Sequence, residues 1–157
     1  MQDILIGILE QGFIYGILAL GVYITYRILD FPDLSVDGTF PMGAAVAAVM
    51  ITVGLNPWLA LIVAFFAGAL AGLVTGLIHV KGHVRDLLSG IITMTALYSI
   101  NIHIAMGKAN LPIFNGKTIF NSGVAVMLPE PLQPYRTLII TGILILLCKV
   151  AMDWYLN

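Results

Sequence analysis

The sequence predicts an all-α protein: a polytopic bundle of about five transmembrane helices, whose second span is short and broken at its start. Two observations predict this class. Hydrophobic residues make up 60% of the 157-residue chain and charged residues only 10%, whereas soluble domains have roughly 45–50% apolar and about 25% charged residues. In addition, the 43 residues from 38 to 80 contain no Asp, Glu, Lys or Arg. A spanning helix needs about 20 apolar residues, so this segment holds two spans and a short turn.

The apolar segments and the turn signals between them place the spans. Asn56-Pro57 marks a turn, and Pro41 suits the first turn of the helix that opens at Phe40. The absence of Lys and Arg near the Asn56-Pro57 turn places the amino terminus outside and the carboxyl terminus in the cytoplasm. A single transmembrane domain is expected over residues 1–157, with spans at about Ile4–Tyr26, Phe40–Leu55, Pro57–Val80, Leu87–Met106 and Tyr135–Leu156 and an outer loop at Gly107–Pro134.

Small residues recur at four-residue spacing along two of these spans. Four residues are just over one helical turn, so the small side chains share one face and form a groove that another backbone can approach closely. Such seams are typical of compact bundles of many helices. The residues predicted to pack helices in this way are Gly12 and Gly16 in the first span, and Ala64, Gly68, Gly72 and Gly76 in the third.

The segment Asp33-Leu-Ser-Val-Asp-Gly38 is the sharpest local signal. It matches the first half of a calcium-binding EF-hand loop, but the twelfth position, which must be acidic, is Ala44. As a pair for acid–base chemistry, Asp33 and Asp37 have no nucleophile or base that the sequence places near them. Two readings remain open. The segment is either irregular backbone that enters a broken helix and lines a wet cavity, or a solvated cytoplasmic loop.

The fourth span is unusually polar for a membrane helix. Ser and Thr can bond back to their own helix, so each of them alone means little. Six polar groups in one span nevertheless favour a helix that faces the bundle or a cavity. These residues are Ser89, Thr93, Thr95, Ser99, Asn101 and His103.

Other chemistry has little support in the sequence. There is no phosphate-cradling glycine loop, no H-E-x-x-H and no G-x-S-x-G, so any nucleotide chemistry must belong to a partner. His79 and His83 have the spacing of metal ligands on a helix, but no third ligand is near. A net charge of −1 gives no basic stripe for nucleic acid. We therefore expect no enzyme activity, no catalytic residue, no metal, no cofactor and no nucleic-acid partner.

Several strings together resemble a known family. They are Leu29-Asp-Phe-Pro-Asp-Leu-Ser-Val-Asp-Gly-Thr-Phe-Pro41, the small-residue run Gly43-Ala-Ala-Val-Ala-Ala48, Gly72-Leu-Val-Thr-Gly76, and Leu87–Tyr98 with Thr93-Met-Thr95 at its centre. In this order they resemble permease subunits of bacterial ABC importers of the branched-chain amino acid and ribose type, and most closely the tryptophan/tyrosine-type subgroup. The resemblance covers essentially the whole chain, although no single motif in it is catalytic.

The resemblance implies a function and partners. Such permeases usually run to nearly twice this length, so the chain is expected to be the amino-terminal half of one. It implies a multi-pass protein of the bacterial inner (plasma) membrane, working with a second permease subunit, two cytoplasmic ATPases and an extracytoplasmic solute-binding protein. The solute would be an amino acid or another small polar metabolite. The pathway residues expected on this basis are Asp33, Ser35, Asp37 and Thr39 at the broken entry to the second span, and Thr93, Thr95 and Asn101 in the fourth.

A different class of function also fits the sequence. A small structural or scaffolding membrane protein could oligomerise through the glycine seam of the third span and transport nothing. Gly72→Leu would then abolish self-association, and no ATPase would co-purify. An intramembrane enzyme is the third class, and the sequence offers it no convincing nucleophile and base.

Overall fold

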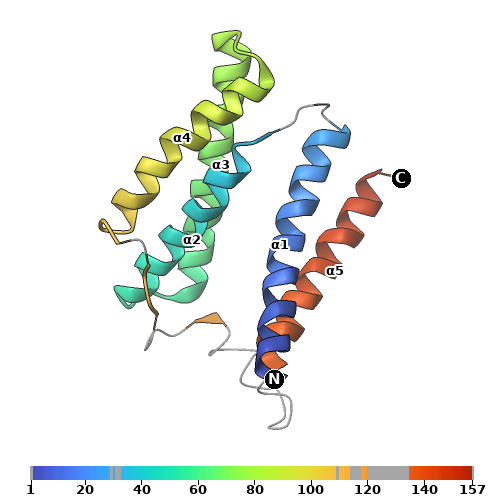
Figure 1. The fold of residues 1–157 in the computed structure, drawn as a ribbon, viewed down its shortest axis with the longest axis vertical. Coiled ribbons are helices and arrows are strands. Elements are labelled where there is room, and N and C mark those ends of the chain that lie inside the picture. The colour runs from blue at the N-terminus through green and yellow to red at the C-terminus, as the bar shows by residue number, and fades with distance from the viewer. Residues whose placement is uncertain are drawn as a thin grey trace. The chain divides into compact units, whose positions relative to one another are not determined.

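All regular elements in the described part of the chain are helices, as the sequence predicts (Figure 1). The computed structural model describes residues 2–28, 30, 33–108, 110–113, 118–119 and 135–156, so most of the expected outer loop (107–134) lies outside the described residues. The helices are α1 (Gln2–Ile28), α2 (Val36–Thr52), α3 (Pro57–Gly82), α4 (Asp86–Ile104) and α5 (Arg136–Leu156). The chain divides into two compact units, one made of Met1–Ile24 with Ile119–Asn157 and the other of Thr25–Thr118.

The distribution of side chains is that of a membrane protein. Four helices, α1, α3, α4 and α5, are long and apolar enough to span a bilayer, and α2 is a shorter apolar helix. Large hydrophobic side chains point outward; Phe65, for example, is 72% exposed. Small and polar residues such as Thr75, Ser89 and Thr93 are buried instead. Helices in lipid gain nothing from hiding large apolar side chains from each other, and they pack through small residues and hydrogen bonds.

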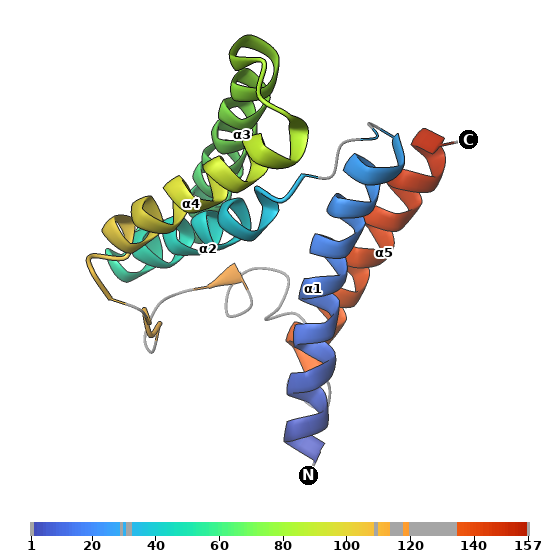
Figure 2. The same cartoon turned by 45° about the horizontal axis from the view of Figure 1, so that its top comes forward.

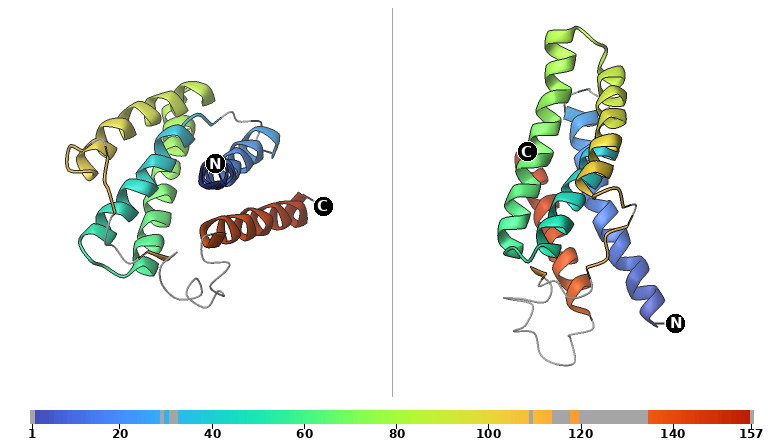
Figure 3. Two further views of the ribbon diagram at one scale, coloured as in Figure 1. Left: turned by 60° about the horizontal axis from the view of Figure 1, so that its bottom comes forward. Right: turned by 90° about the vertical axis from the view of Figure 1, so that its left-hand side faces the viewer.

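Two tight turns connect the helices of the unit 25–118. Gly54 has a φ of +87° between α2 and α3, a conformation that glycine adopts without strain. Asn56 then caps α3, because its side-chain oxygen accepts a hydrogen bond from the Trp58 N–H at 3.0 Å. At the other end of α3, His83 takes a left-handed conformation (φ +51°), and the His79 ring nitrogen Nδ1 lies 2.9 Å from the Val84 carbonyl oxygen. These turns make α3 antiparallel to both α2 and α4 (Figure 3).

Two glycines let α2 and α4 approach each other closely as parallel neighbours (Figure 2). A Cβ atom on Gly38 would lie 3.1 Å from the Met94 Cα, and one on Gly90 would lie 2.9 Å from the Leu34 backbone nitrogen. Both distances are shorter than ordinary contacts, so the two backbones leave no room for a side chain at these points. The α2–α4 contact is therefore a small-residue seam.

The start of the second helix differs from the prediction. We expected a helix that opens at Phe40, with Pro41 in its first turn. The structure has a short helix, as expected, and a turn at Leu34–Ser35 before it, but the helix begins at Val36 and continues through Pro41. Proline was taken as a start signal because it removes no hydrogen bond in a first turn. Here it lies one turn further in, where its ring disfavours the helical bond to residue 37.

The unit that joins the two ends of the chain contains α1 and α5, which lie side by side and run in the same direction (Figure 1). The Phe13 ring occupies the space beside Gly142, and the Ile145 side chain occupies the space beside Gly16. The residue numbers of the contacting pairs therefore rise together along both helices, as they do in a parallel pair.

Candidate functional site

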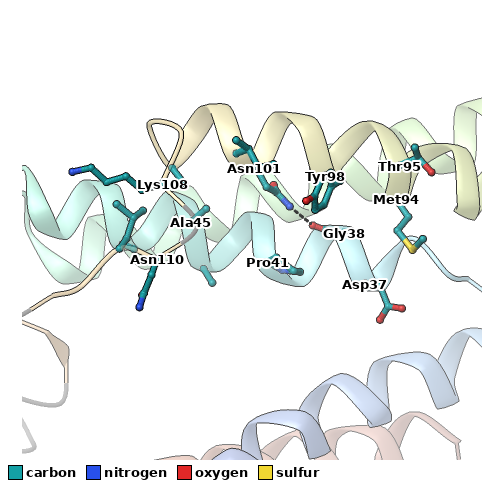
Figure 4. Close-up of a pocket in the computed structure, with 15 residues that line it drawn as sticks. Asp37, Gly38, Pro41, Ala45, Met94, Thr95, Tyr98, Asn101, Lys108 and Asn110 are labelled. Carbon is teal, nitrogen blue, oxygen red and sulfur yellow. Dashed lines mark hydrogen bonds between the residues drawn. The ribbon is translucent and has the colours of Figure 1, made fainter.

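An open groove of about 800 Å³ runs along the α2–α4 pair, entirely within the unit 25–118 (Figure 4). Its volume is that of a site for a small molecule. One wall is the face of α2 that carries Asp37, Gly38, Pro41, Ala44, Ala45 and Ala48; the other carries Met94, Thr95, Tyr98, Asn101, Ile102 and Ala105, and the chain after α4 adds Lys108, Asn110 and Leu111.

Three of the seven predicted pathway residues line this groove: Asp37, Thr95 and Asn101. Asp37 is exposed in the first turn of α2, where the helix dipole favours a carboxylate. The Thr95 hydroxyl is exposed and donates to the Ile91 carbonyl oxygen at 2.8 Å, so its lone pairs stay available to accept. The structure thus brings together a carboxylate, a hydroxyl and an amide from two helices.

The other four predicted residues build the helices rather than line the groove. The Asp33 carboxylate accepts a hydrogen bond from the Ser35 N–H at 2.8 Å, which closes the turn before α2. Ser35 is 1% exposed, and its carbonyl oxygen accepts from the amides of residues 38 and 39. Thr39 donates to the Val36 carbonyl oxygen at 3.4 Å, and buried Thr93 donates to the Ser89 carbonyl oxygen at 3.0 Å. A pathway role for these four stays a prediction, and their contacts are those of residues that position the groove walls.

Asn101 is the polar residue that joins the two walls (Figure 4). Its amide nitrogen Nδ2 donates to the Gly38 carbonyl oxygen of α2 at 3.0 Å. That oxygen can only accept, so the contact fixes the NH₂ group on this side and the oxygen Oδ1 on the other. Oδ1 is buried, and within the described part of the chain it has no hydrogen-bond partner. An unpartnered buried acceptor is uncommon in folded proteins and calls for a reason.

Sequence reasoning missed other residues of the groove. Tyr98 is 71% exposed and lies one turn from both Thr95 and Asn101 on α4; the three- and four-residue spacing that places side chains on one helix face would have found it. Lys108 and Asn110 were missed because they were assigned to an outer loop. Figure 4 shows Lys108 at the opposite end of the groove from Asp37, so the two groove ends carry opposite charges.

The six residues predicted to pack helices have different surroundings. Gly16 lies against Ile145, and the Ala64 carbonyl oxygen would be 3.9 Å from a Cβ on Gly43. Beside the other four, no atom of another segment in the described part of the chain lies within 4 Å of the point where a Cβ would sit; these are Gly12, Gly68, Gly72 and Gly76. Their role in packing stays a prediction, and it would require a helix from elsewhere. The buried face of α3 consists instead of Ala60, Ala71 and Thr75.

Four candidate spans within the described residues, together with buried small and polar residues and an outward apolar surface, define a multi-pass integral membrane protein. Comparison with known proteins gives the family. Residues 4–156 match the family described as "Branched-chain amino acid transport system / permease component", and the chain belongs to this family. It is a multi-pass protein of the bacterial inner membrane.

The curated relatives agree with this assignment. The chain is 42% identical over 153 residues to the tyrosine transport system permease protein of Clostridioides difficile, a match that covers 98% of this chain and 48% of the relative. It is 32% identical over 114 residues to the ribose import permease protein RbsC of Haemophilus influenzae, covering 73% of this chain and 34% of the relative. The chain thus spans about half or less of the length of these relatives. No solved structure matches it.

Proposed function

We propose that this chain forms part of the transmembrane pathway of a binding-protein-dependent ABC importer, and that the α2–α4 groove is a section of that pathway. The single observation that carries the proposal is the groove itself. It collects a carboxylate, a hydroxyl, a phenol and an amide on the facing walls of two helices. Polar groups are costly in lipid and are kept where they face a cavity or a polar pathway.

The partners follow from the same proposal. The importer would contain a second permease subunit, cytoplasmic ATPase subunits and an extracytoplasmic solute-binding protein. The chain itself would catalyse no covalent step, because ATP hydrolysis would take place on the separate subunit. ATP would be coupled to movement through the difference in solute affinity between the inward-facing and outward-facing states.

The solute we propose is an amino acid. Support comes from the printed name of the 42% identical relative, a tyrosine transport system permease protein. The groove supports it too, since it carries the Asp37 carboxylate, which would attract the ammonium group of such a solute. The 32% identical relative is a ribose import permease, so ribose is the comparison solute for every uptake measurement.

Uptake into proteoliposomes tests this function through two carboxylates that lie four residues apart. Asp37→Ala removes a charge from the groove wall, so we expect reduced ATP-dependent uptake, with a loss of stability no larger than the roughly 0.3–1 kcal/mol of a carboxylate in the first turn of a helix. Asp33→Ala removes the acceptor that closes the turn before α2, so we expect reduced stability. Normal uptake by the Asp37 variant would take the groove out of the pathway.

Co-purification distinguishes the importer from the scaffolding alternative. An importer should retain an ATPase through detergent extraction and size-exclusion chromatography. A scaffold should purify without one, and Gly72→Leu should make it monomeric, since the Gly72 face is open in the described part of the chain. Retention of the ATPase by the Gly72→Leu protein would favour the importer.

A further inference from the structure

The turn between α3 and α4 carries two cations that the described part of the chain leaves unpaired (Figure 1). Lys81 lies in the last turn of α3 and Arg85 directly before α4, and both residues are exposed. Neither forms an ion pair with a described residue. Asp86 follows Arg85, but it lies in the first turn of α4, where the helix dipole accommodates its charge. The turn therefore presents positive charge that an anion can meet.

A hydrogen bond across the turn keeps the two cations close together. The His79 ring nitrogen Nδ1 lies 2.9 Å from the Val84 carbonyl oxygen, and because that oxygen can only accept, the ring is the donor. Lys81 and Arg85 are four residues apart, so their Cα atoms are separated by at most about 14 Å. Two long side chains at that separation can reach one phosphate group, which Arg binds through two parallel N–H donors.

Lys81 ends a row of large hydrophobic side chains on α3. Their spacing of three and four residues places them on one face of the helix, and each is between 43% and 62% exposed. We call this face the α3 outer stripe; its members are Phe66, Leu70, Leu73 and Leu77. At about 3.6 residues per turn, the stripe lies on the side of α3 turned away from the buried Ala60, Ala71 and Thr75. Lys81 follows Leu77 by four residues and continues the same face.

The residues of the α3 outer stripe suit lipid better than another helix. Where α2 and α4 touch, they do so through Gly38 and Gly90. Helices in a bilayer approach each other through such small residues, because large apolar side chains are solvated equally well by lipid tails. The members of the α3 outer stripe are all large and exposed, so acyl chains are their expected neighbours.

The length of α3 places Lys81 at the level of the lipid headgroups. Trp58, at the other end of α3, is 51% exposed, and exposed tryptophans gather at the membrane interface. Lys81 lies 23 residues further along (81 − 58), which is about 35 Å at 1.5 Å per residue. Since a hydrocarbon core is about 30 Å thick, a helix with Trp58 at one interface has Lys81 at the other. There the Lys81 stem can follow apolar surface while its ammonium group reaches the phosphates.

We propose that Lys81 and Arg85 bind the phosphate of an anionic phospholipid such as phosphatidylglycerol, whose acyl chains lie along the α3 outer stripe. An anionic headgroup is favoured over a zwitterionic one, because it carries no ammonium group to oppose the two cations. A bound headgroup would also hold the start of α4, where Gly90 packs against the turn that leads into α2. The inference stands apart from the proposed transport function.

Matched variants separate a lipid site from a general effect of charge. Lys81→Gln and Arg85→Gln each remove one cation of the site, and Lys81→Arg keeps it. Lys149→Gln is the control, because it makes the same change at an exposed lysine of α5 whose ammonium group already lies 3.4 Å from the Asp153 carboxylate. All three positions are exposed, so the substitutions leave the packing of the helices intact.

The measurement is lipid binding to the purified full chain, with any subunits that co-purify, by native mass spectrometry. Dioleoylphosphatidylglycerol is titrated into detergent-solubilised protein. Dioleoylphosphatidylcholine is the zwitterionic comparison, and glycerol 3-phosphate supplies the headgroup without acyl chains. Thermal unfolding with and without each lipid reports stability.

We expect the affinity for phosphatidylglycerol to fall about fivefold in Lys81→Gln and in Arg85→Gln, the factor that one cation near an anionic headgroup contributes. The double variant should bind about 25-fold more weakly. Lys81→Arg and Lys149→Gln should bind like unaltered protein. Phosphatidylglycerol should raise the midpoint of thermal unfolding of unaltered protein more than phosphatidylcholine does, and this difference should disappear in the double variant.

Three outcomes would contradict this proposal. Equal loss of phosphatidylglycerol binding in Lys81→Gln and Lys149→Gln would show that only net charge matters. Displacement of phosphatidylglycerol by an equal concentration of glycerol 3-phosphate would make the turn a phosphate site to which the α3 outer stripe contributes nothing. Unchanged lipid binding by the double variant would remove the site, and an accompanying loss of a co-purifying ATPase would assign the turn to that partner.

Discussion

The close approach of the Gly90 backbone to the turn before α2 makes a quantitative prediction. A Cβ atom at this position would lie 2.9 Å from the Leu34 nitrogen and 3.2 Å from the Ser35 nitrogen. Ordinary contacts begin at 3.4 Å, so Gly90→Ala requires the turn before α2 to move by about 0.5 Å (3.4 − 2.9). The obstacle is backbone, which cannot rotate aside as the end of a side chain can.

Two opposing terms set the expected effect on stability. Replacing a glycine inside a helix by alanine stabilises by about 1 kcal/mol, while forcing extra volume into a packed contact costs about 1–3 kcal/mol. Gly90→Ala should therefore destabilise the protein by about 0–2 kcal/mol. Gly76→Ala lies in the same unit of the chain and has no neighbouring atom within 4 Å, so it should stabilise by up to about 1 kcal/mol. The propensity term cancels between the two variants, and the remaining difference of about 1–3 kcal/mol is the packing term.

Equilibrium unfolding in mixed micelles, with circular dichroism to follow helix content, measures this difference. The function should respond as well, because the displaced turn leads directly into the part of α2 that carries Asp37. Gly90→Ala should therefore weaken solute binding even where the protein remains folded. A Gly90→Ala protein that is as stable as Gly76→Ala would refute the close α2–α4 contact and, with it, the position of the groove.

Two further predictions concern the ends of the helices. Asn56→Ala should destabilise the protein by about 0.5–2 kcal/mol in the same unfolding experiment, because the Trp58 N–H loses its acceptor. The control Asn56→Asp keeps an acceptor and should destabilise the protein less than Asn56→Ala does. Equal losses of stability in the two variants would show that the cap contributes nothing. For the second prediction, residue 30 or residue 55 is replaced by cysteine in a protein that also carries Cys148→Ser. A membrane-impermeant maleimide should label the two single-cysteine proteins from opposite sides of the membrane. Labelling of both from the same side would show that α2 does not cross.

The sequence predicted the fold because lipid simplifies the problem. Where no water is available, only helices can satisfy the backbone of a spanning segment, so apolar length was enough to find α1, α3, α4 and α5. The predicted start of α2 was wrong because Pro41 was interpreted as a local signal for the first turn of a helix. Whether proline can lie inside a helix depends on tertiary packing, and α2 packs against α4, which is distant in sequence. Local pattern contains no information on that contact.

The candidate site was predicted in its residue types more than in its geometry. Asp37, Thr95 and Asn101 were found because polar groups stand out in apolar spans. Sequence could not separate them from Asp33 and Thr93, which have the same chemistry but do not line the groove. That distinction depends on which helix lies alongside, and the parallel pairing of α2 with α4 is a property of the fold.

The direction of α5 decides how the shortest helix relates to the membrane. Since α1 and α5 run in parallel, the chain leaves α1 on one side of the membrane and enters α5 from the other. An odd number of crossings must therefore lie between them. Among the residues that the structure describes, α3 and α4 supply two crossings, and α2 is the helix left to supply a third. Its 17 residues extend about 26 Å, which is less than the roughly 30 Å of a hydrocarbon core. The turn at Asp33–Ser35 is thus drawn toward the hydrophobic region, where its polar groups must be satisfied within the protein. The Ser35 N–H donates to the Asp33 carboxylate, and the turn packs closely against Gly90 of α4. A short crossing with a polar entrance leaves Asp37 at the edge of the hydrocarbon, at the end of the groove opposite Lys108.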